Sequence, residues 1–180
     1  MIPFVGFSKI PRLMREMIIT EKIDGTNAQV WISDDLSEVV AGSRHHWLLP
    51  GQPDNHGFRA WVEGNRDELL KLGPGHHIGE WWGQGIQRNY GLKEKRFSLF
   101  NTFRWSDAAV RPACCHVVPV LYQGLFDTEE IDYQLYLLSL DGSRAAPGFM
   151  QPEGVVVFHV AGNLLFKRTI EKDEERKGNG

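Results

Sequence analysis

The sequence has 180 residues, of which 42% are hydrophobic and 24% are charged, and its formal net charge is -3. These values are typical of a soluble globular protein and exclude a disordered or fibrous chain. No apolar run approaches the roughly 20 residues that span a bilayer, and the N-terminus lacks the pattern of a secretory signal. We therefore expect residues 1–180 to form a single domain with its own core.

Short apolar runs separated by glycine and proline predict a mixed α+β fold with mainly antiparallel sheets. In chain order we expect strands at 17–24, 28–32, 38–42, 76–80, 96–101, 116–122, 154–159 and 164–168. The first two flank a turn at Gly25-Thr26-Asn27, as in a hairpin. A helix is expected from about Phe58 to Leu72. A second helix should begin at Asp127, with Glu130 as its capping-box partner, and end before Gly142.

Cysteine and histidine do not indicate a metal site or a disulfide framework. Cys114 and Cys115 are adjacent, and two thiols supply neither a set of disulfides nor a zinc site. The pairs 45–46 and 76–77 place their two histidines on opposite faces of a strand. This usage favours a reducing compartment, and we expect a cytoplasmic protein.

The most informative segment is Thr20-Glu-Lys-Ile-Asp-Gly-Thr-Asn27, which ends the first expected strand. Its lysine, Lys22, can act as a nucleophile when the amine is neutral. Removing the proton from an ordinary lysine costs about 4.6 kcal/mol at pH 7, so a metal ion or cationic neighbours would be needed. Gly25 lets a phosphate approach closely. The alternative interpretation is a surface hairpin with a Lys22–Asp24 pair.

Lys22-Ile-Asp-Gly-Thr-Asn27 resembles the Lys-x-Asp-Gly motif of the covalent nucleotidyltransferases, which include ATP-dependent DNA and RNA ligases and mRNA capping enzymes. The Gly-Thr-Asn continuation is most similar to the RNA ligase branch. Further blocks resemble the other motifs of this superfamily in the required order: Ser43-Arg44, His77–Gly83 with Gly85–Arg88, Phe97–Asn101, Pro152–Val157 and Leu165–Lys167. The resemblance spans about 21–167 and implies a nucleotidyltransferase (ATP-grasp-like) ligase core. Ligases commonly append a second domain, and we expect no appended C-terminal domain here, which is a departure from the family.

The resemblance also assigns roles to residues. It implies that Lys22, Lys167 and Glu153 are catalytic and that Glu153 holds a divalent metal. The residues that it implies for nucleotide binding are Glu21, Lys22, Asp24, Gly25, Asn27, Arg44, Glu80, Phe100, Glu153 and Lys167. The implied cofactors are ATP and Mg²⁺ or Mn²⁺.

Two of these assignments have a physical argument of their own. Glu80 lies among apolar and small residues, and ribose hydroxyls would satisfy a carboxylate buried there. Glu153 offers the hard oxygen ligand that Mg²⁺ prefers. The resemblance alone implies that Phe100 stacks on the adenine, and Phe97 would take that place if the register differed. Thr169 departs from the family pattern, because the superfamily usually has a second lysine at that position.

The implied function is that of an ATP-dependent RNA (polynucleotide) ligase. Lys22 would take AMP from ATP and pass it to a 5′-phosphate end, which a 3′-hydroxyl would then join. The alternatives are a capping-type guanylyltransferase, a DNA ligase, and a non-catalytic nucleotide- or RNA-binding module, which the threonine at position 169 would favour. We expect a monomer that acts on RNA or DNA ends, helped by a protein partner that supplies nucleic-acid binding.

A basic stretch is the candidate path for the nucleic acid. Residues 84–112 hold six basic residues and two acidic ones, a net charge of +4 in an otherwise acidic chain. Phosphate neutralisation by three or four of these side chains predicts weak binding that falls with salt.

Overall fold

The computed structural model describes residues 2–171, and in these residues the chain forms two sheets with helices packed against them. The strands are β1 (Glu16–Lys22), β2 (Thr26–Ile32), β3 (Val39–Ser43), β4 (Gly75–Gly83), β5 (Lys95–Leu99), β6 (Cys115–Val117), β7 (Val120–Leu125), β8 (Gly154–His159) and β9 (Leu164–Thr169). The helices are α1 (Phe58–Gly64), α2 (Arg66–Leu69), α3 (Thr102–Trp105) and α4 (Thr128–Asp141), with 3₁₀ turns at Asn55–Gly57 and Leu70–Leu72.

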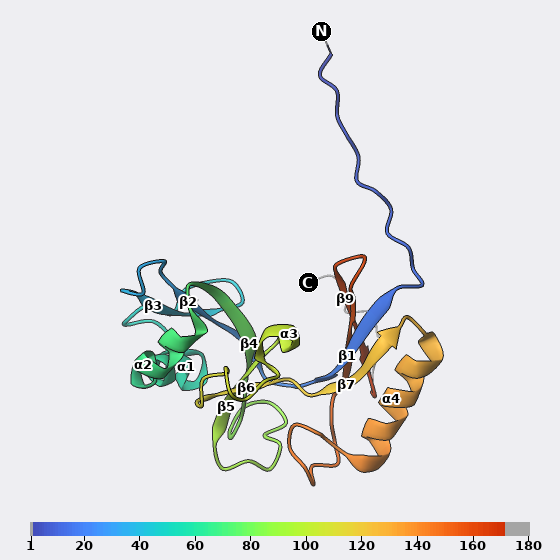
Figure 1. Ribbon diagram of the computed structural model, residues 1–180. Coiled ribbons are helices and arrows are strands. Elements are labelled where there is room, and N and C mark those ends of the chain that lie inside the picture. The colour runs from blue at the N-terminus through green and yellow to red at the C-terminus, as the bar shows by residue number, and fades with distance from the viewer. Residues whose placement is uncertain (1, 172–180) are drawn as a thin grey trace.

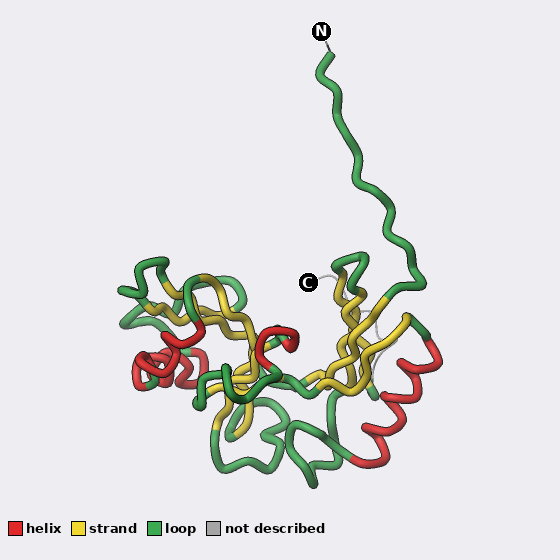
Figure 2. The backbone as a smooth tube through the Cα atoms, in the orientation of Figure 1, coloured by secondary structure: helices red, strands yellow, loops and turns green. Residues whose placement is uncertain are grey.

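One sheet has five strands in the order β3-β2-β4-β5-β6, and the other has four in the order β7-β1-β8-β9. All pairings are antiparallel except that of β5 with β6. Figures 1 and 2 show the two sheets as separate lobes, with α1 and α2 on one and α4 on the other. The expected α+β fold with mainly antiparallel sheets is confirmed. That the whole chain forms one domain stays a prediction.

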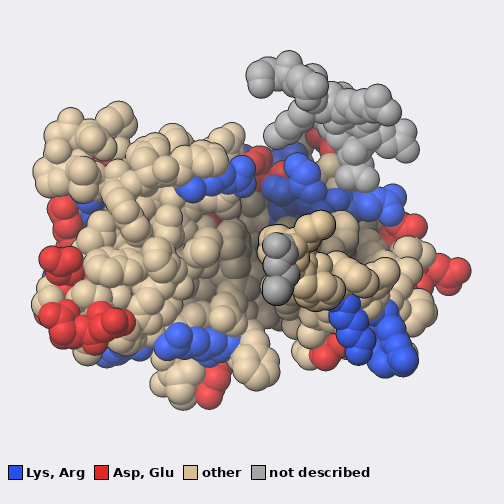
Figure 3. All heavy atoms as spheres, turned by 90° about the horizontal axis from the view of Figure 1, so that it is seen from above, with Lys and Arg blue, Asp and Glu red and all other residues tan. Residues whose placement is uncertain are grey.

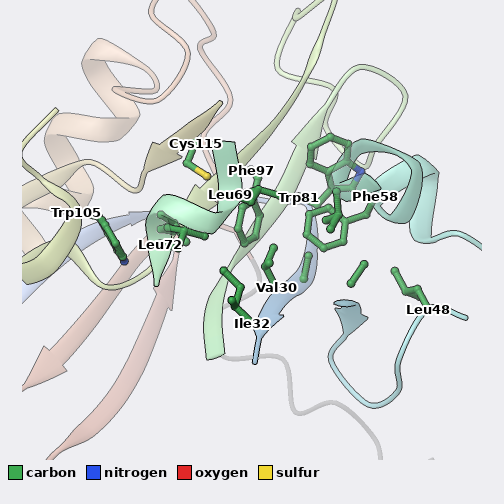
Figure 4. Close-up of a cluster of buried hydrophobic side chains, with 14 of the residues drawn as sticks. Val30, Ile32, Leu48, Phe58, Leu69, Leu72, Trp81, Phe97, Trp105 and Cys115 are labelled. Carbon is green, nitrogen blue, oxygen red and sulfur yellow. The ribbon is translucent and has the colours of Figure 1, made fainter. Parts of the chain in front are cut away.

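The five-stranded sheet carries the larger core on its outer face, the face turned toward α1 and α2. Alternation along β2 buries Ala28, Val30 and Ile32 on this side. The rings of Trp81 and Phe97 lie 5.3 and 5.1 Å from that of Phe58, centroid to centroid. Figure 4 shows these aromatic side chains packed together, with aliphatic residues extending the cluster. The residues that alternate with these buried side chains along each strand therefore lie on the opposite, inner face of the sheet.

The four-stranded sheet packs on α4 in the same way. Met17 and Ile19 from β1 and Val155 and Val157 from β8 form a buried cluster with Leu138 of the helix. The helix begins where expected, because the carboxylate of its N-terminal neighbour, Asp127, accepts the backbone N–H of Glu129 at 2.9 Å. The expected capping box would have Glu130 accept the backbone N–H of Asp127, but its carboxylate accepts a hydrogen bond from Gln134 instead.

A third apolar cluster joins the two sheets. Ile23, which follows β1, packs with Trp82, Tyr90, Val118 and Ala146. The rings of Trp82 and Tyr90 meet edge to face at 4.9 Å. The chain crosses between the sheets in this region, so the cluster fixes the ends of β1 and β4 next to each other.

Three expectations about local structure are wrong. β1 and β2 do not form a hairpin, because they belong to different sheets. The strand expected at 116–122 is two strands in different sheets, interrupted at Val118-Pro119, where proline has no N–H to donate. The helix expected from Phe58 to Leu72 breaks after Gly64, a residue with low helix propensity, into α1, α2 and a 3₁₀ turn.

Among residues 2–171, no helix has both the length and the apolar character needed to cross a membrane.

Candidate active site at the junction of the sheets

Lys22 ends β1 at the edge where the four-stranded sheet meets the other lobe. Its strand neighbour is Gly154 at the start of β8, and Glu153 directly precedes that glycine. The Lys22 Nζ lies 2.5 Å from Glu153 Oε2, and the two side chains are 22% and 17% exposed. The sequence therefore brings a lysine and a carboxylate that are 131 positions apart into a partly shielded ion pair.

The five-stranded sheet contributes a buried carboxylate to the same junction. Glu80 on β4 lies opposite Asn27 on β2 and is 7% exposed. Its Oε1 accepts the backbone N–H of Gly25 at 3.1 Å, and its Oε2 accepts Asn27 Nδ2–H at 2.9 Å. Burial raises the pKa of Glu80 to about 7, although the charge of Lys22 and the Gly25 N–H oppose this shift.

Gly25 allows the backbone after β1 to pass close to β4. A Cβ at this position would lie 2.5 Å from the carbonyl oxygen of Trp81 and 2.7 Å from Trp82 Cβ. The backbone can therefore pass between the sheets, and donate to Glu80, only without a side chain here.

Asp24 is held from two sides by residues of the 84–92 loop. Arg88 Nε lies 3.1 Å from Asp24 Oδ2, and Arg88 Nη1 donates to the carbonyl of Gln151 at 3.0 Å. The Asp24 N–H donates to the hydroxyl of Tyr90 at 2.7 Å. Arg88 thus links the segment after Lys22 to the loop that precedes Glu153. Sequence reasoning assigned Arg88 to nucleic acid and missed Tyr90, for which no local pattern gives a signal.

The donor set at the junction fits a hydrated divalent cation. Asp24, Glu80 and Glu153 offer carboxylate oxygens, and the charges of Asp24, Glu153 and Lys22 all act on Glu80. Hard oxygen donors suit Mg²⁺ and Mn²⁺. Among residues 2–171, no three side chains of His, Cys, Asp or Glu gather closely enough to form a site alone. A cation here would therefore keep water or phosphate ligands, as Mg²⁺ usually does.

Lys167 and Thr169 on β9 lie on the Lys22 face of the four-stranded sheet. The register places Thr169 opposite Gly154, and Gly154 opposite Lys22, whereas Lys167 lies two residue pairs further along, opposite Val156. Residues two apart share a face of a strand. Lys167 is exposed. Thr169 therefore lies at the same register position as Lys22, two strands away across the sheet.

The two phenylalanines of the 97–101 block have different environments. Phe97 is fully buried in the core on the outer face, so it cannot stack on a ligand. Phe100 directly follows β5, donates its N–H to the Ile78 carbonyl at 3.0 Å and is 41% exposed. Arg44 is exposed and follows Ser43, which pairs with Ala28, the neighbour of Asn27. Both residues lie beside the junction, at its margin.

Glu21, unlike the other predicted site residues, points its side chain away from the junction that Lys22 faces. It is 1% exposed, and its carboxylate accepts bonds from Ser143 Oγ at 2.5 Å and from the N–H groups of Arg144 and Ala145 at 2.8 Å. Burial raises the pKa of Glu21, and these hydrogen bonds oppose the shift. Because alternate residues of β1 face opposite sides, Glu21 holds the loop after α4 while Lys22 faces the junction.

Most cations of the basic stretch at 84–112 already have protein partners. Besides Arg88, the contacts are Lys95 with the His56 carbonyl, Arg96 with Glu94, Arg104 with the Leu72 carbonyl, and Arg111 with the carbonyls of Trp105 and Cys115. Their charges anchor loops, so this stretch offers fewer phosphate contacts than its sequence predicts. Figure 3 shows the surface hollowed between the two lobes, with Lys and Arg side chains at the margins of the hollow.

Comparison with known proteins gives both a family and a fold. A family model described as RNA ligase matches residues 15–170. No match is found among the curated proteins.

Similar solved structures include variants of an RNA ligase from Naegleria gruberi. A variant solved with AMP and Mn has a TM-score of 0.67 and 20% identity, covering 87% of this chain and 50% of that one. A variant with ATP and Mn has a TM-score of 0.66 and 20% identity, covering 88% and 51%. An apo variant has a TM-score of 0.65 and 21% identity, covering 91% and 53%. The chain thus spans about half the length of these relatives and shares their fold.

Proposed function

Because the chain belongs to the RNA ligase family, we propose that it is an ATP-dependent RNA ligase that works through a lysyl-AMP at Lys22. The observation that carries the proposal is the junction itself, where Lys22 pairs with Glu153 beside a buried Glu80. A nucleophile, a metal-binding carboxylate and a recognition carboxylate meet there from two sheets. The surface hairpin that would explain the Lys22–Asp24 segment without function does not form.

In the first step the Lys22 nitrogen attacks the α-phosphorus of ATP, and the bond to the pyrophosphate oxygen breaks. The amine attacks in its neutral form, the N–P bond of the phosphoramidate forms as pyrophosphate leaves, and the nitrogen gives up a proton to water. Lys167, on the same sheet face, and Arg44, at the margin of the junction, are the cations placed to neutralise the phosphates. A divalent ion held by Glu153 would compete with the Lys22 ammonium for that carboxylate and so favour the neutral amine.

The five-stranded sheet would hold the nucleoside. Glu80 is buried and fixed by Gly25 and Asn27, so its remaining lone pairs can accept ribose hydroxyls with little reorganisation. Phe100 is the exposed aromatic side chain of its block and would stack on the adenine.

In the later steps AMP passes to a 5′-phosphate, and a 3′-hydroxyl displaces AMP to form the phosphodiester. We propose RNA ends as the substrates and a monomer as the active form. A protein partner would supply further nucleic-acid binding, because most cations of the basic stretch are engaged within the protein.

The test is self-adenylylation with α-labelled ATP and Mg²⁺. The wild-type chain should become labelled, and Lys22→Ala should not. Lys71→Ala is the matched control, since Lys71 is an exposed lysine paired with Glu68 away from the junction, and it should label normally. Labelling of the Lys22→Ala chain would contradict the assigned nucleophile.

A second measurement separates the alternatives. Offering labelled GTP tests the guanylyltransferase, and supplying 5′-phosphorylated DNA in place of RNA tests the DNA ligase. Thr169, which lies at the same register position as Lys22, favours the non-catalytic module. That module would bind ATP without becoming labelled.

A further inference from the structure

The inner face of the five-stranded sheet continues beyond Glu80 as a row of aromatic and apolar side chains. The register pairs Gln29 with Ile78, and Trp31 with His76, on the same side as Asn27 and Glu80. Ile78 is 53% exposed, and His76 is exposed. In the proposed function this face holds the nucleotide, and exposed side chains therefore continue along it beyond the nucleotide site.

The 44–47 turn adds a tryptophan to this face. The Ser43 N–H donates to the His46 carbonyl and the Leu48 N–H to the Ala41 carbonyl, both at 2.9 Å, so the chain folds back along β3. Leu48 is buried in the core on the outer face, which turns its neighbour Trp47 to the inner face. There Trp47 lies against Gly42, where a Cβ would come within 2.9 Å of the indole.

The aromatic rings on this face form an ordered group. The Trp47 and His76 rings are stacked, with centroids 6.0 Å apart and planes 28° apart, and Trp31 lies 6.4 Å from Trp47. His76 Nδ1 is 3.0 Å from Gln29 Oε1, which fixes its ring. Trp47 is nevertheless 38% exposed. We call Trp31, Trp47, His76 and Ile78 together the stacking surface.

The dimensions of the stacking surface suit a short stretch of nucleic acid. Trp31 lies four positions along β2 from Asn27, which is beside the nucleotide in the proposed function, and this corresponds to about 13 Å along a strand. That is the length of about four stacked nucleotides at 3.4 Å each. Arg44 lies in the same turn as Trp47, is exposed, and offers a cation to the phosphates at this edge.

We propose that the stacking surface binds the unpaired nucleotides of the RNA strand next to its reacting end, with bases stacked on Trp47 and its neighbours. The inference rests on the proposed function, because it extends the strand path from the nucleotide site. Aromatic side chains bind single strands through base stacking without reading sequence. This route also replaces the basic stretch at 84–112 as the main path, since most of the cations of that stretch are engaged.

The test is RNA affinity, measured by fluorescence anisotropy with a labelled single-stranded RNA carrying a 5′-phosphate. Replacing Trp47→Ala removes one stacking partner and should weaken binding about tenfold, whereas Trp47→Phe keeps a ring and should restore most of the affinity. Tyr133→Ala is the matched control, because Tyr133 is a 54% exposed aromatic on α4 in the other lobe, and it should bind as the wild type does.

Self-adenylylation, measured without RNA, distinguishes failure of this inference from failure of the proposed function. The Trp47→Ala chain should label as the wild type does and melt at a similar temperature. If the wild type labels but Trp47→Ala binds RNA with unchanged affinity, the stacking surface serves another partner and the inference is wrong. If the wild type does not label but RNA affinity still depends on Trp47, the proposed function fails and the surface assignment stands.

Discussion

The two sheets differ in how firmly they hold the side chains that they bring to the junction. On the four-stranded sheet, Lys22 and Glu153 are partly exposed and paired with each other, and Lys167 is exposed. On the five-stranded sheet, Glu80 is buried and held by two hydrogen bonds before any ligand arrives. In the proposed function, the side chains of the four-stranded sheet must exchange partners before Lys22 can attack, whereas Glu80 is already arranged to bind the nucleotide.

This difference separates the expected effects of substitutions. Changes on the four-stranded sheet should lower the rate of self-adenylylation at saturating ATP. Changes on the five-stranded sheet should alter stability or the ATP concentration that half-saturates the reaction. A substitution on the four-stranded sheet that changed only the half-saturating ATP concentration would contradict this division. So would a substitution on the five-stranded sheet that changed only the rate at saturating ATP.

The largest effect should come from Glu153→Gln. The amide keeps the size of the side chain but removes the charge that pairs with Lys22 and that would hold a cation, so we expect the labelling rate at saturating ATP to fall about 100- to 1,000-fold. Pre-steady-state labelling measures this rate. Glu129→Gln on α4, an exposed carboxylate outside the junction, should label normally. A loss confined to ATP affinity would place Glu153 among the recognition residues instead.

Glu80→Gln should change the dependence of stability on pH. Burial raises the pKa of Glu80 from 4.5 to about 7, so its contribution to stability is fully present below pH 4.5 and is lost as pH rises through 7. The loss amounts to about 3 kcal/mol, and the glutamine variant should not show it.

Urea unfolding between pH 4.5 and 8 measures this difference. Glu63→Gln is the control, because the Glu63 side chain is 64% exposed and its replacement should leave the wild-type pH profile in place. Parallel stability profiles for the wild type and Glu80→Gln would contradict the raised pKa.

The smallest effect should come from Phe100→Ala. Losing one aromatic stack costs roughly 1 kcal/mol, so the half-saturating ATP concentration should rise about fivefold while the maximal rate holds. Phe103→Ala is a close control, since Phe103 is 96% exposed on the following short helix α3. Titration of ATP in the labelling assay checks both variants. Equal effects from the two would remove the stacking role of Phe100.

The local pattern predicted most strands because β-branched and aromatic residues alternate or cluster between glycine and proline. It failed where the outcome depended on partners far along the chain. A Gly25-Thr26-Asn27 turn between two strands reads as a hairpin, but Glu80, 55 positions away from Gly25, makes it a crossing between sheets. The break at Pro119 has the same cause, since β6 and β7 pair in different sheets.

The candidate site shows the same division. Motif resemblance predicted that Lys22, Glu80 and Glu153 share a site, and in the structure the three side chains lie close to one another. The resemblance also assigns Glu21 to the same site, although strand alternation already implies that its side chain and that of Lys22 face opposite sides of the sheet. The support that Arg88 and Tyr90 give to Asp24 depends on a loop that no periodic pattern describes.

The position of β1 in its sheet has a consequence for how the chain folds while it is being synthesised. β1 is flanked by β7 and β8, and its last residue, Lys22, pairs with Gly154. A ribosome therefore adds some 130 residues after the lysine before the partner strand exists, which takes roughly 7 to 26 seconds at 5–20 residues per second. During that interval the edge of β1 that will pair with β8 has no partner, and sequence-distant pairing of this kind is slow. The nascent chain thus carries Lys22 long before it carries Glu153, the partner of that lysine in the folded protein.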